Sequence, residues 1–322
     1  MNYFVLLGKL GDIVLFSRLS WSFPRQISII TRSVFVDICV KYGKFYKVIS
    51  IEEITETISE KDIIIDLHNK SEQDEVYRVN IKKIFPVFYA TQARAKFLEL
   101  HYVNQIERRN HKTTSLIEYW KSQIERFYPC SDNEYFQDDL WQYPLEGWSL
   151  EKKIDILVSF QSSTLNKMFD KQSTRYLAEA LFRLGEVKNK KVVFLMGPGE
   201  ISVRATFSEY LQDSLAETLY IDRLEELFEI IRNSEFVITV DNGIKHIAGM
   251  FGKKIVSIYG PTSFQTCGSD RNEVAIHSKI GCSPCGYINE CPLYNTREKK
   301  CLTMSDAIMV YKTFIKILEE EQ

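Results

Sequence analysis

Residues 241–248 (DNGIKHIA) contain the groups that proteins use to bind phosphate. They follow an apolar run and begin a helix, and backbone N–H groups at a helix N-terminus bind phosphate with help from the helix dipole. Gly243 lets an anion approach the backbone closely, and Lys245 and His246 add donors for anionic oxygens. The alternative is an Asp241 N-cap on an ordinary helix, with His246 merely packed.

A hydroxyl-rich loop, residues 162–169 (SSTLNKMF), follows another apolar run. Ser162, Ser163 and Lys167 are suited to clamp a diphosphate, because hydroxyls and an ammonium donate hydrogen bonds to anionic oxygens. The glycine spacing of a Walker A loop is absent. The alternative is a polar loop with a solvated lysine.

A carboxylate near the N-terminus is a third functional residue. Asp12 ends the segment 8–12 (GKLGD), which follows the first apolar run. Two glycines match the dinucleotide-binding fingerprint only weakly, because its third glycine is missing. We interpret Asp12 as a catalytic carboxylate that faces an interdomain cleft, or as an N-cap.

Four of the seven cysteines fall within twenty residues: Cys282, Cys285, Cys291 and Cys301. This spacing can surround a tetrahedral metal ion. The sequence therefore predicts a structural zinc or iron site, with reduced or redox-labile thiols as the alternative. A catalytic zinc is not expected, because no His–Glu arrangement accompanies the cluster.

Short apolar runs at residues 154–160, 191–196, 236–240 and 255–259 position these groups. Each run ends in a polar or glycine-rich turn, and ligands of parallel α/β sheets bind at the carboxyl ends of the strands. The alternation of strand-like and helical segments predicts parallel sheets built from βαβ units. We expect an α/β protein with one domain at 1–150, including a linker at 131–150. The second domain is expected at 151–322, with a Cys-rich loop at 282–301 and a C-terminal helix.

Bulk properties agree with a two-domain globular protein of 322 residues. The net charge of −2 argues against a nucleic-acid-binding protein. No signal peptide and no apolar run of about 18 residues is present, so we expect a cytoplasmic protein with reduced cysteines.

Residues 78–112 carry eight Lys or Arg against two Glu. One interpretation is a solvated basic helix face. The other is contact with an anionic acceptor or a membrane surface, for which we name Arg78, Lys82, Lys83, Arg94 and Lys96.

Taken in chain order, these motifs resemble glycosyltransferase family 9, the heptosyltransferases of lipopolysaccharide assembly. The matching segments are 11–12 (GD), 65–69 (IDLHN), the loop ending at Lys167, 197–200 (GPGE), 241–248 and 259–262 (YGPT), with the terminal Cys-x-x-Cys and Cys-Pro. The chain departs from the family in having no glycine at 160–164 and in placing Asn242-Gly243-Ile244 where Thr-Gly-Pro is common.

The resemblance implies a GT-B architecture, in which two Rossmann-like domains with parallel sheets face an interdomain cleft. It implies inverting, metal-independent transfer of a heptose from ADP-heptose to a lipopolysaccharide core or related glycan. Asp12 would be the general base, and the N-terminal domain would hold an anionic glycolipid acceptor. The C-terminal domain would hold the ADP-sugar through these residues: Ser162, Ser163, Lys167, Glu200, Asp241, Asn242, Gly243 and His246.

Two alternatives stay open. The first keeps the transferase but uses another nucleotide sugar or a protein acceptor, as in autotransporter glycosylation. The second, of a different class, is a non-catalytic nucleotide-binding protein. The enzyme is expected in the cytoplasm, with peripheral contact at the inner face of the cytoplasmic membrane as an option.

Overall fold

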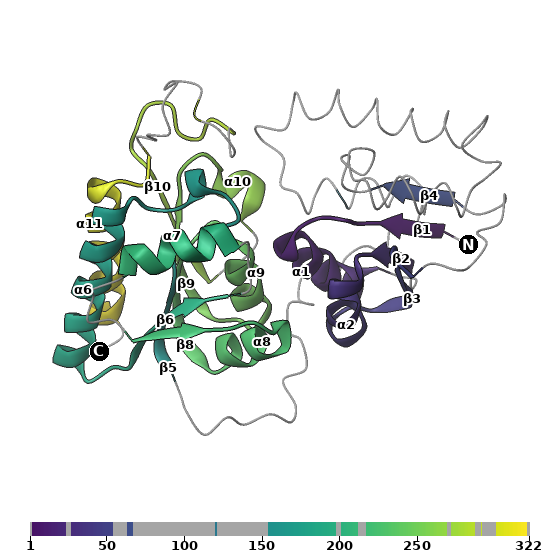
Figure 1. Ribbon diagram of the computed structural model, residues 1–322, viewed down its shortest axis with the longest axis horizontal. Helices are drawn as coiled ribbons and strands as arrows, with labels where there is room; N and C mark the ends of the chain where they lie inside the picture. Colours follow the sequence, from purple (N-terminus) through teal and green to yellow (C-terminus); the bar gives the residue numbers. More distant parts are fainter. Residues whose placement is uncertain are drawn as a thin grey trace. The chain divides into compact units, whose positions relative to one another are not determined.

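The computed structural model describes residues 2–23, 27–53, 63–66, 120, 154–197, 201–211, 217–268, 272–286, 291 and 301–320. The chain divides into two compact units, Met1–Trp141 and Gln142–Gln322. Each unit is built on its own parallel sheet (Figure 1). No helix in the described part of the chain is long and apolar enough to span a bilayer.

The N-terminal unit contains a sheet with the strand order β3-β2-β1-β4. Its strands are β1 (Asn2–Val5), β2 (Ile27–Thr31), β3 (Phe45–Ser50) and β4 (Ile63–Asp66). The helices are α1 (Leu10–Leu19), which continues into the short 3-10 helix η1 (Ser20–Ser22), and α2 (Ser33–Tyr42). The apolar segment 28–39 therefore contains most of a strand and most of a helix.

Aromatic packing holds α1 against this sheet. Phe16 on α1 is fully buried, and its ring centroid lies 6.2 Å from that of Phe4 on β1. Trp120 meets the same ring edge-on at 5.4 Å, although it comes from far along the chain. Because apolar burial is the main driving force for packing, this cluster fixes where α1 begins and therefore where Asp12 lies.

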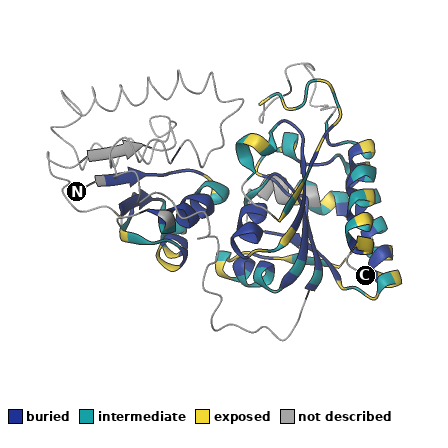
Figure 2. Ribbon diagram, turned by 180° about the vertical axis from the view of Figure 1, so that it is seen from behind, coloured by how far each residue is buried: buried dark blue, intermediate teal, exposed yellow. Residues whose placement is uncertain are grey.

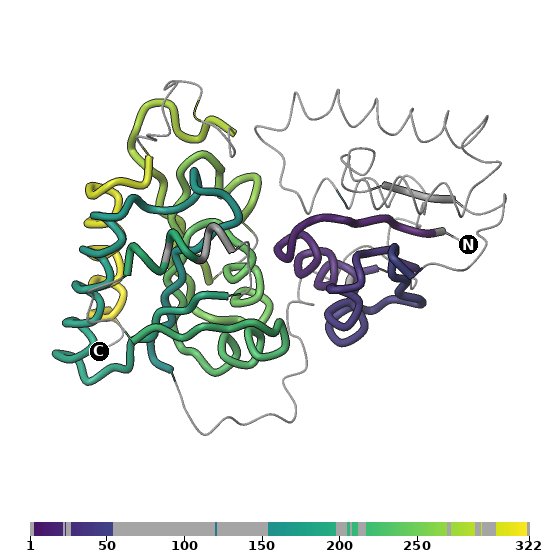
Figure 3. The backbone as a smooth tube through the Cα atoms, viewed as in Figure 1, coloured from purple at the N-terminus to yellow at the C-terminus, as the bar shows by residue number. Residues whose placement is uncertain are grey.

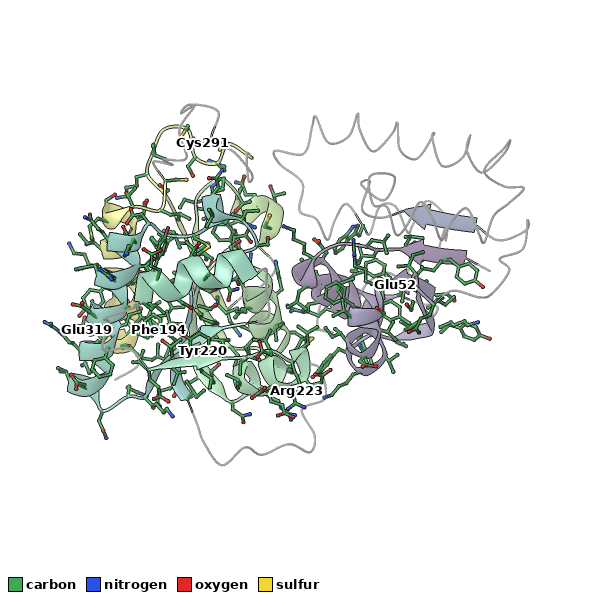
Figure 4. The ribbon with its side chains drawn as sticks, in the orientation of Figure 1. Glu52, Phe194, Tyr220, Arg223, Cys291 and Glu319 are labelled. Carbon is green, nitrogen blue, oxygen red and sulfur yellow. The ribbon has the colours of Figure 1, made fainter. Side chains whose placement is uncertain are left out.

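The C-terminal unit contains a six-stranded sheet with the order β10-β9-β8-β5-β6-β7, and all of its strand pairs are parallel. Its strands are β5 (Ile154–Ser159), β6 (Val192–Met196), β7 (Thr218–Tyr220), β8 (Ser234–Val240), β9 (Lys254–Tyr259) and β10 (Glu273–His277). Figure 4 labels Phe194 within this sheet, where its side chain is completely buried.

Helices cover both faces of this sheet. They are η3 (Leu165–Lys167), α6 (Lys171–Lys188), α7 (Ile201–Leu211), α8 (Leu224–Arg232), α9 (Gly243–Met250), α10 (Phe264–Cys267) and α11 (Met304–Glu320). The C-terminal α11 lies beside α6, although more than a hundred residues separate them, as the tube in Figure 3 shows. Helices α8 and α9 contact each other and pack against β8.

The spacing of apolar residues along α6 explains which side of this helix is buried. Apolar residues of α6 recur at helical spacing and are buried at Leu177, Leu181 and Leu184, whereas most residues on the opposite side are intermediate or exposed. Figure 2 shows that the strands of the sheet are mostly buried, while exposed residues lie on the outer helices and loops. Asp170 caps the N-terminus of α6 by accepting a hydrogen bond from the Ser173 N–H at 2.7 Å.

The strand order of this sheet indicates where a ligand is expected to bind. Numbered within the unit, the order is 3-2-1-4-5-6, and the chain reverses direction across the sheet between β5 and β8. Ligands of doubly wound sheets bind beyond the carboxyl ends of the strands at such a switch point. The loop after β5 leads into residues 162–169, and the loop after β8 leads into residues 241–248; these are the two segments predicted to bind phosphate.

Candidate functional site

Hydrogen bonds join the two loops at the switch point. The Thr239 hydroxyl on β8 donates to the Ser159 carbonyl on β5 at 2.8 Å. The Asn242 side-chain amide donates to the Gln161 carbonyl at 2.7 Å. The backbone after β5 is therefore fixed to the start of α9.

An ion pair completes this junction. Lys167 lies in η3, and its Nζ is 2.6 Å from Asp241 Oδ2. The lysine side chain retains 17% of its surface exposed and the Asp241 side chain only 5%. Two residues that the sequence selected from separate motifs are thus in contact.

The N-terminus of α9 begins one residue later than an Asp241 cap would place it. Gly243 is the first residue of the helix, and Asn242 is the N-cap, because its Oδ1 accepts the Lys245 backbone N–H at 3.1 Å. The alternative of an Asp241 N-cap is therefore wrong. Asn242 stands where Thr is common in the family, and its amide also supplies the bond to Gln161.

The prediction that Lys245 offers a donor to a bound anion is also wrong. Only 1% of its surface is exposed. Its Nζ lies 3.0 Å from Asp241 Oδ1, 2.7 Å from the Tyr259 hydroxyl and 2.8 Å from the Cys267 carbonyl. Sequence alone could not assign this direction, because helical spacing does not say which face of α9 is covered.

Asp241 is ionised in the folded protein. Burial by itself raises the pKa of a carboxyl group, but the positive charges of Lys245 and Lys167, together with His246, outweigh it. The pKa of Asp241 is therefore held far below its usual range.

This shift predicts an acid-dependent loss of stability. The unfolded carboxyl titrates near pKa ~3.9. Its folded pKa is lower, so Asp241 stabilises the fold above that pH and loses this contribution as the pH falls toward ~2. In Asp241→Asn we expect the slope of unfolding free energy against pH between about 2 and 4 to fall by up to ~1.4 kcal/mol per pH unit. Urea unfolding at several pH values measures it. An unchanged slope would show that Asp241 does not titrate in this way.

The other residues predicted to bind the ADP-sugar differ in how far they are exposed to solvent. His246 is 6% exposed and Ser162 is 4% exposed, whereas Ser163 is exposed. His246 lies close enough to Asp241 to influence its pKa. Glu200 and the predicted acceptor residues lie outside the described residues, as does the linker at 131–150; the acceptor residues are Arg78, Lys82, Lys83, Arg94 and Lys96.

Asp12 lies in the first turn of α1, after the carboxyl end of β1. One carboxylate oxygen, Oδ2, accepts the Lys9 backbone N–H at 2.9 Å. Asp12 is thus the third residue of the helix rather than its N-cap, and its negative charge suits the positive end of the helix dipole. The side chain is half-buried.

Gly8 leaves room for this carboxylate. A Cβ at position 8 would lie 2.5 Å from Asp12 Oδ2 and 2.8 Å from Asp12 Cβ. Gly8→Ala should therefore displace Asp12. If Asp12 is the general base that the resemblance implies, turnover should fall about tenfold or more, since small misplacements of reacting groups cost that much or more. A steady-state transfer assay measures it. Gly252→Ala, which strains the backbone at φ +64° in the other unit, is the control for a loss caused by lower stability alone. Full activity in Gly8→Ala would mean that Asp12 needs no fixed position.

The cysteine loop is anchored to the turn after β9. The Ser283 hydroxyl donates to the Gly260 carbonyl at 2.6 Å, and the Gly286 N–H donates to the Pro261 carbonyl at 2.7 Å. Figure 4 labels Cys291, which is half-buried like Cys282, Cys285 and Cys301. Among the described residues, no three His, Cys, Asp or Glu side chains are placed to hold one metal ion. The predicted metal site thus still depends on sequence spacing alone.

Sequence reasoning missed three residues of the buried network behind Asp241. Gln161 contributes only its carbonyl, for which no sequence signal exists. Tyr259 and Glu273 lie on β9 and β10, and the Tyr259 hydroxyl donates to Glu273 Oε1. Glu273 opens β10 directly after two polar residues, so the sequence offered no clear signal that its side chain is buried.

The fold and the junction between the loops after β5 and β8 indicate the class of protein. Two α/β units, each built on a parallel sheet and one with polar loops joined at a switch point, fit the GT-B architecture that the resemblance implies. The model of glycosyltransferase family 9 (heptosyltransferase) matches residues 62–293. The chain belongs to this family, so the resemblance, the fold class and the prediction of a glycosyltransferase are confirmed.

A curated relative and several solved structures are similar to the chain. Lipooligosaccharide heptosyltransferase 2 of Campylobacter jejuni is 30% identical over 95 residues, which span 29% of this chain and 30% of that protein. The E. coli heptosyltransferase WaaC with ADP has a TM-score of 0.63 and 14% identity, covering 98% of both chains. The iron-containing dodecameric glycosyltransferase TibC of enterotoxigenic E. coli has a TM-score of 0.56 and 12% identity, covering 98% of this chain and 76% of that one.

Proposed function

We propose that the protein transfers a heptose from ADP-heptose to a lipopolysaccharide core or related glycan. The observation that carries the proposal is the contact between Lys167 and Asp241 at the switch point, beside the N-terminus of α9. Further support comes from WaaC, which has the same fold and was solved with ADP.

Departure of the nucleotide is the demanding step. When the bond from the anomeric carbon to the diphosphate breaks, negative charge builds on the leaving phosphate oxygens. Lys167 and the first N–H groups of α9 are the groups that would stabilise this charge. We propose that this stabilisation suffices without a catalytic metal.

Attack by the acceptor needs a base. We assign it to Asp12, whose carboxylate would take the proton of the acceptor hydroxyl while that oxygen forms the new bond to the anomeric carbon. Direct displacement from the face opposite the leaving diphosphate inverts the configuration. The proposed donor site is completed by these residues: Ser162, Ser163, Glu200, Asp241, Asn242, Gly243 and His246.

The acceptor is proposed to be an anionic glycolipid. Its carboxylates or phosphates would meet the basic residues between positions 78 and 112, which are suited to bind such groups. A cytoplasmic location with peripheral contact at the inner face of the membrane follows from such an acceptor.

A second acceptor class stays open. Transfer to a protein would use the same donor chemistry, and the described residues of the C-terminal unit carry no feature that separates the two acceptors. A non-catalytic nucleotide-binding protein would keep the Lys167 junction but would not need Asp12.

A structural zinc or iron ion on Cys282, Cys285, Cys291 and Cys301 is proposed from their spacing. TibC, of the same fold, is described as containing iron. Elemental analysis of protein purified without chelator tests it. Less than one equivalent of metal per chain would remove the ion from the proposal.

The test of the proposed function is calorimetric titration with ADP, UDP and GDP without added metal, followed by a transfer assay with ADP-heptose. We expect selective binding of ADP. A preference for UDP or GDP would keep the transferase but discard heptose. Failure to bind all three would favour the non-catalytic alternative.

A further inference from the structure

The Asp241 carboxylate is held between two ammonium groups, one on each oxygen. Lys167 Nζ lies 2.6 Å from Oδ2, and Lys245 Nζ lies 3.0 Å from Oδ1. The two lysines differ in burial: 17% of the Lys167 side chain is exposed and 1% of the Lys245 side chain. Lys167 is therefore the one that solvent and ligands can reach.

Lys245 is fixed in its place. Its ammonium donates hydrogen bonds to the Tyr259 hydroxyl at 2.7 Å and to the Cys267 carbonyl at 2.8 Å, and it forms the ion pair with Asp241 Oδ1. The tyrosine ring adds a cation–π contact, with Nζ 4.7 Å from its centroid. The Lys245 ammonium is therefore held by groups of the protein and is closed to solvent.

Glu273 holds the tyrosine in the required orientation. The Tyr259 hydroxyl donates to Glu273 Oε1, so its oxygen lone pairs are available to accept from Lys245. Burial, then the negative charges of Glu273 and Asp241, raise the pKa of Tyr259 far above its usual range, so the hydroxyl stays protonated. Glu273 Oε1 also lies 4.0 Å from Lys245 Nζ and adds to the attraction.

This arrangement bears on how a diphosphate binds. A carboxylate beside the diphosphate site repels the ligand unless its charge is compensated, and a buried carboxylate that loses its counter-ion is strongly destabilised. If Lys167 alone balanced Asp241, the ligand would have to remove that counter-ion. With Lys245 on the other oxygen, Asp241 stays compensated when Lys167 moves to the ligand.

We infer that Lys245 is a positioning residue of the donor site: it neutralises Asp241 from behind and so releases Lys167 for the diphosphate of the nucleotide. The inference depends on the proposed function, because it assumes a nucleoside diphosphate at this site. Lys245 itself does not touch the ligand.

The decisive experiment measures ADP affinity by calorimetry in four proteins: wild type, Lys245→Met, Asp241→Asn and the double variant. We expect Lys245→Met to weaken ADP binding about tenfold or more, since Lys167 is then retained by Asp241. Adding Asp241→Asn removes the competing carboxylate and should restore the affinity to within about threefold of Asp241→Asn alone. A purely structural role of Lys245 predicts no such rescue. The inference is overturned if Lys245→Met loses no ADP affinity, or if the double variant does not regain the affinity that Lys245→Met loses.

A milder pair of variants covers the case in which Lys245→Met does not fold. Tyr259→Phe and Ser257→Ala each remove one hydroxyl that donates to Glu273 Oε1, from neighbouring positions on one face of β9. Tyr259 also accepts from Lys245. We expect ADP affinity to fall about fivefold in Tyr259→Phe and to change less than about twofold in Ser257→Ala. Equal affinities in the two variants would overturn the inference.

The same titrations separate this inference from the proposed function. If wild-type protein does not bind ADP, the function fails. If wild type binds ADP and Lys167→Ala does not, but Lys245→Met binds like wild type, the function stands and the role of Lys245 is refuted.

Discussion

Asp12→Asn is expected to abolish most turnover while leaving ADP binding within about twofold of wild type. General base catalysis contributes about 10²- to 10⁴-fold to rate, so we expect a loss of about three orders of magnitude. Asparagine keeps the shape of the side chain, and its Oδ1 can still accept the Lys9 N–H that Asp12 accepts at 2.9 Å. The start of α1 should therefore survive, and the loss should fall on kcat.

The measurement is ADP release from ADP-heptose in the presence of a heptose-free lipopolysaccharide acceptor, with thermal unfolding of each variant in parallel. Asp37→Asn is the matched control, because Asp37 is an exposed carboxylate on α2 of the same unit. Turnover in Asp12→Asn close to that of the control would remove Asp12 as the base, even if ADP binding had already supported the donor site.

Lys167→Ala is expected to weaken ADP binding by about 10- to 100-fold, the loss that corresponds to one charge-assisted hydrogen bond in a partly buried site. The fold should persist, because Lys245 still compensates the buried Asp241 carboxylate at 3.0 Å. The effect should thus appear in affinity more than in the temperature of unfolding.

Lys171→Ala is the matched control for this prediction. Lys171 begins α6 four residues later and pairs with Glu209 at an exposed position, where an ion pair contributes little. Calorimetry should find the ADP affinity of this variant unchanged. Equal affinities in the two alanine variants would exclude Lys167 from the diphosphate site.

Much of the site could be predicted from residue types that follow apolar runs. Lys167 and Asp241 both follow strands of the C-terminal sheet, and a parallel sheet brings such positions to one edge. Asp12 comes shortly after a strand of the N-terminal sheet. Local chemistry carries this information, since helix dipoles, glycine and hydroxyl or ammonium donors act on anions in any fold. The direction of Lys245 was not predictable, because the same type of side chain binds an anion when exposed and a buried carboxylate when covered.

The cap of α9 illustrates the same limit at shorter range. Both Asp241 and Asn242 are good N-cap residues, and their sequence positions differ by one. Asn242 is the cap, while the Asp241 carboxylate pairs with two lysines, one of which comes from the loop after β5. Local sequence does not reveal this distant partner, so it could not separate the two candidate caps.

The sequence by itself determined the α/β class, the family and the polar turns in which functional residues lie, because period, strand-end chemistry and motif order are local properties of the chain. The tertiary structure decided which turns meet. The order β10-β9-β8-β5-β6-β7 brings β5 beside β8, and so Lys167 to Asp241 across more than seventy residues. It also covers α9 so that Lys245 faces inward to Tyr259. Such pairings follow from the burial of whole helix and sheet faces, which no short stretch of sequence specifies.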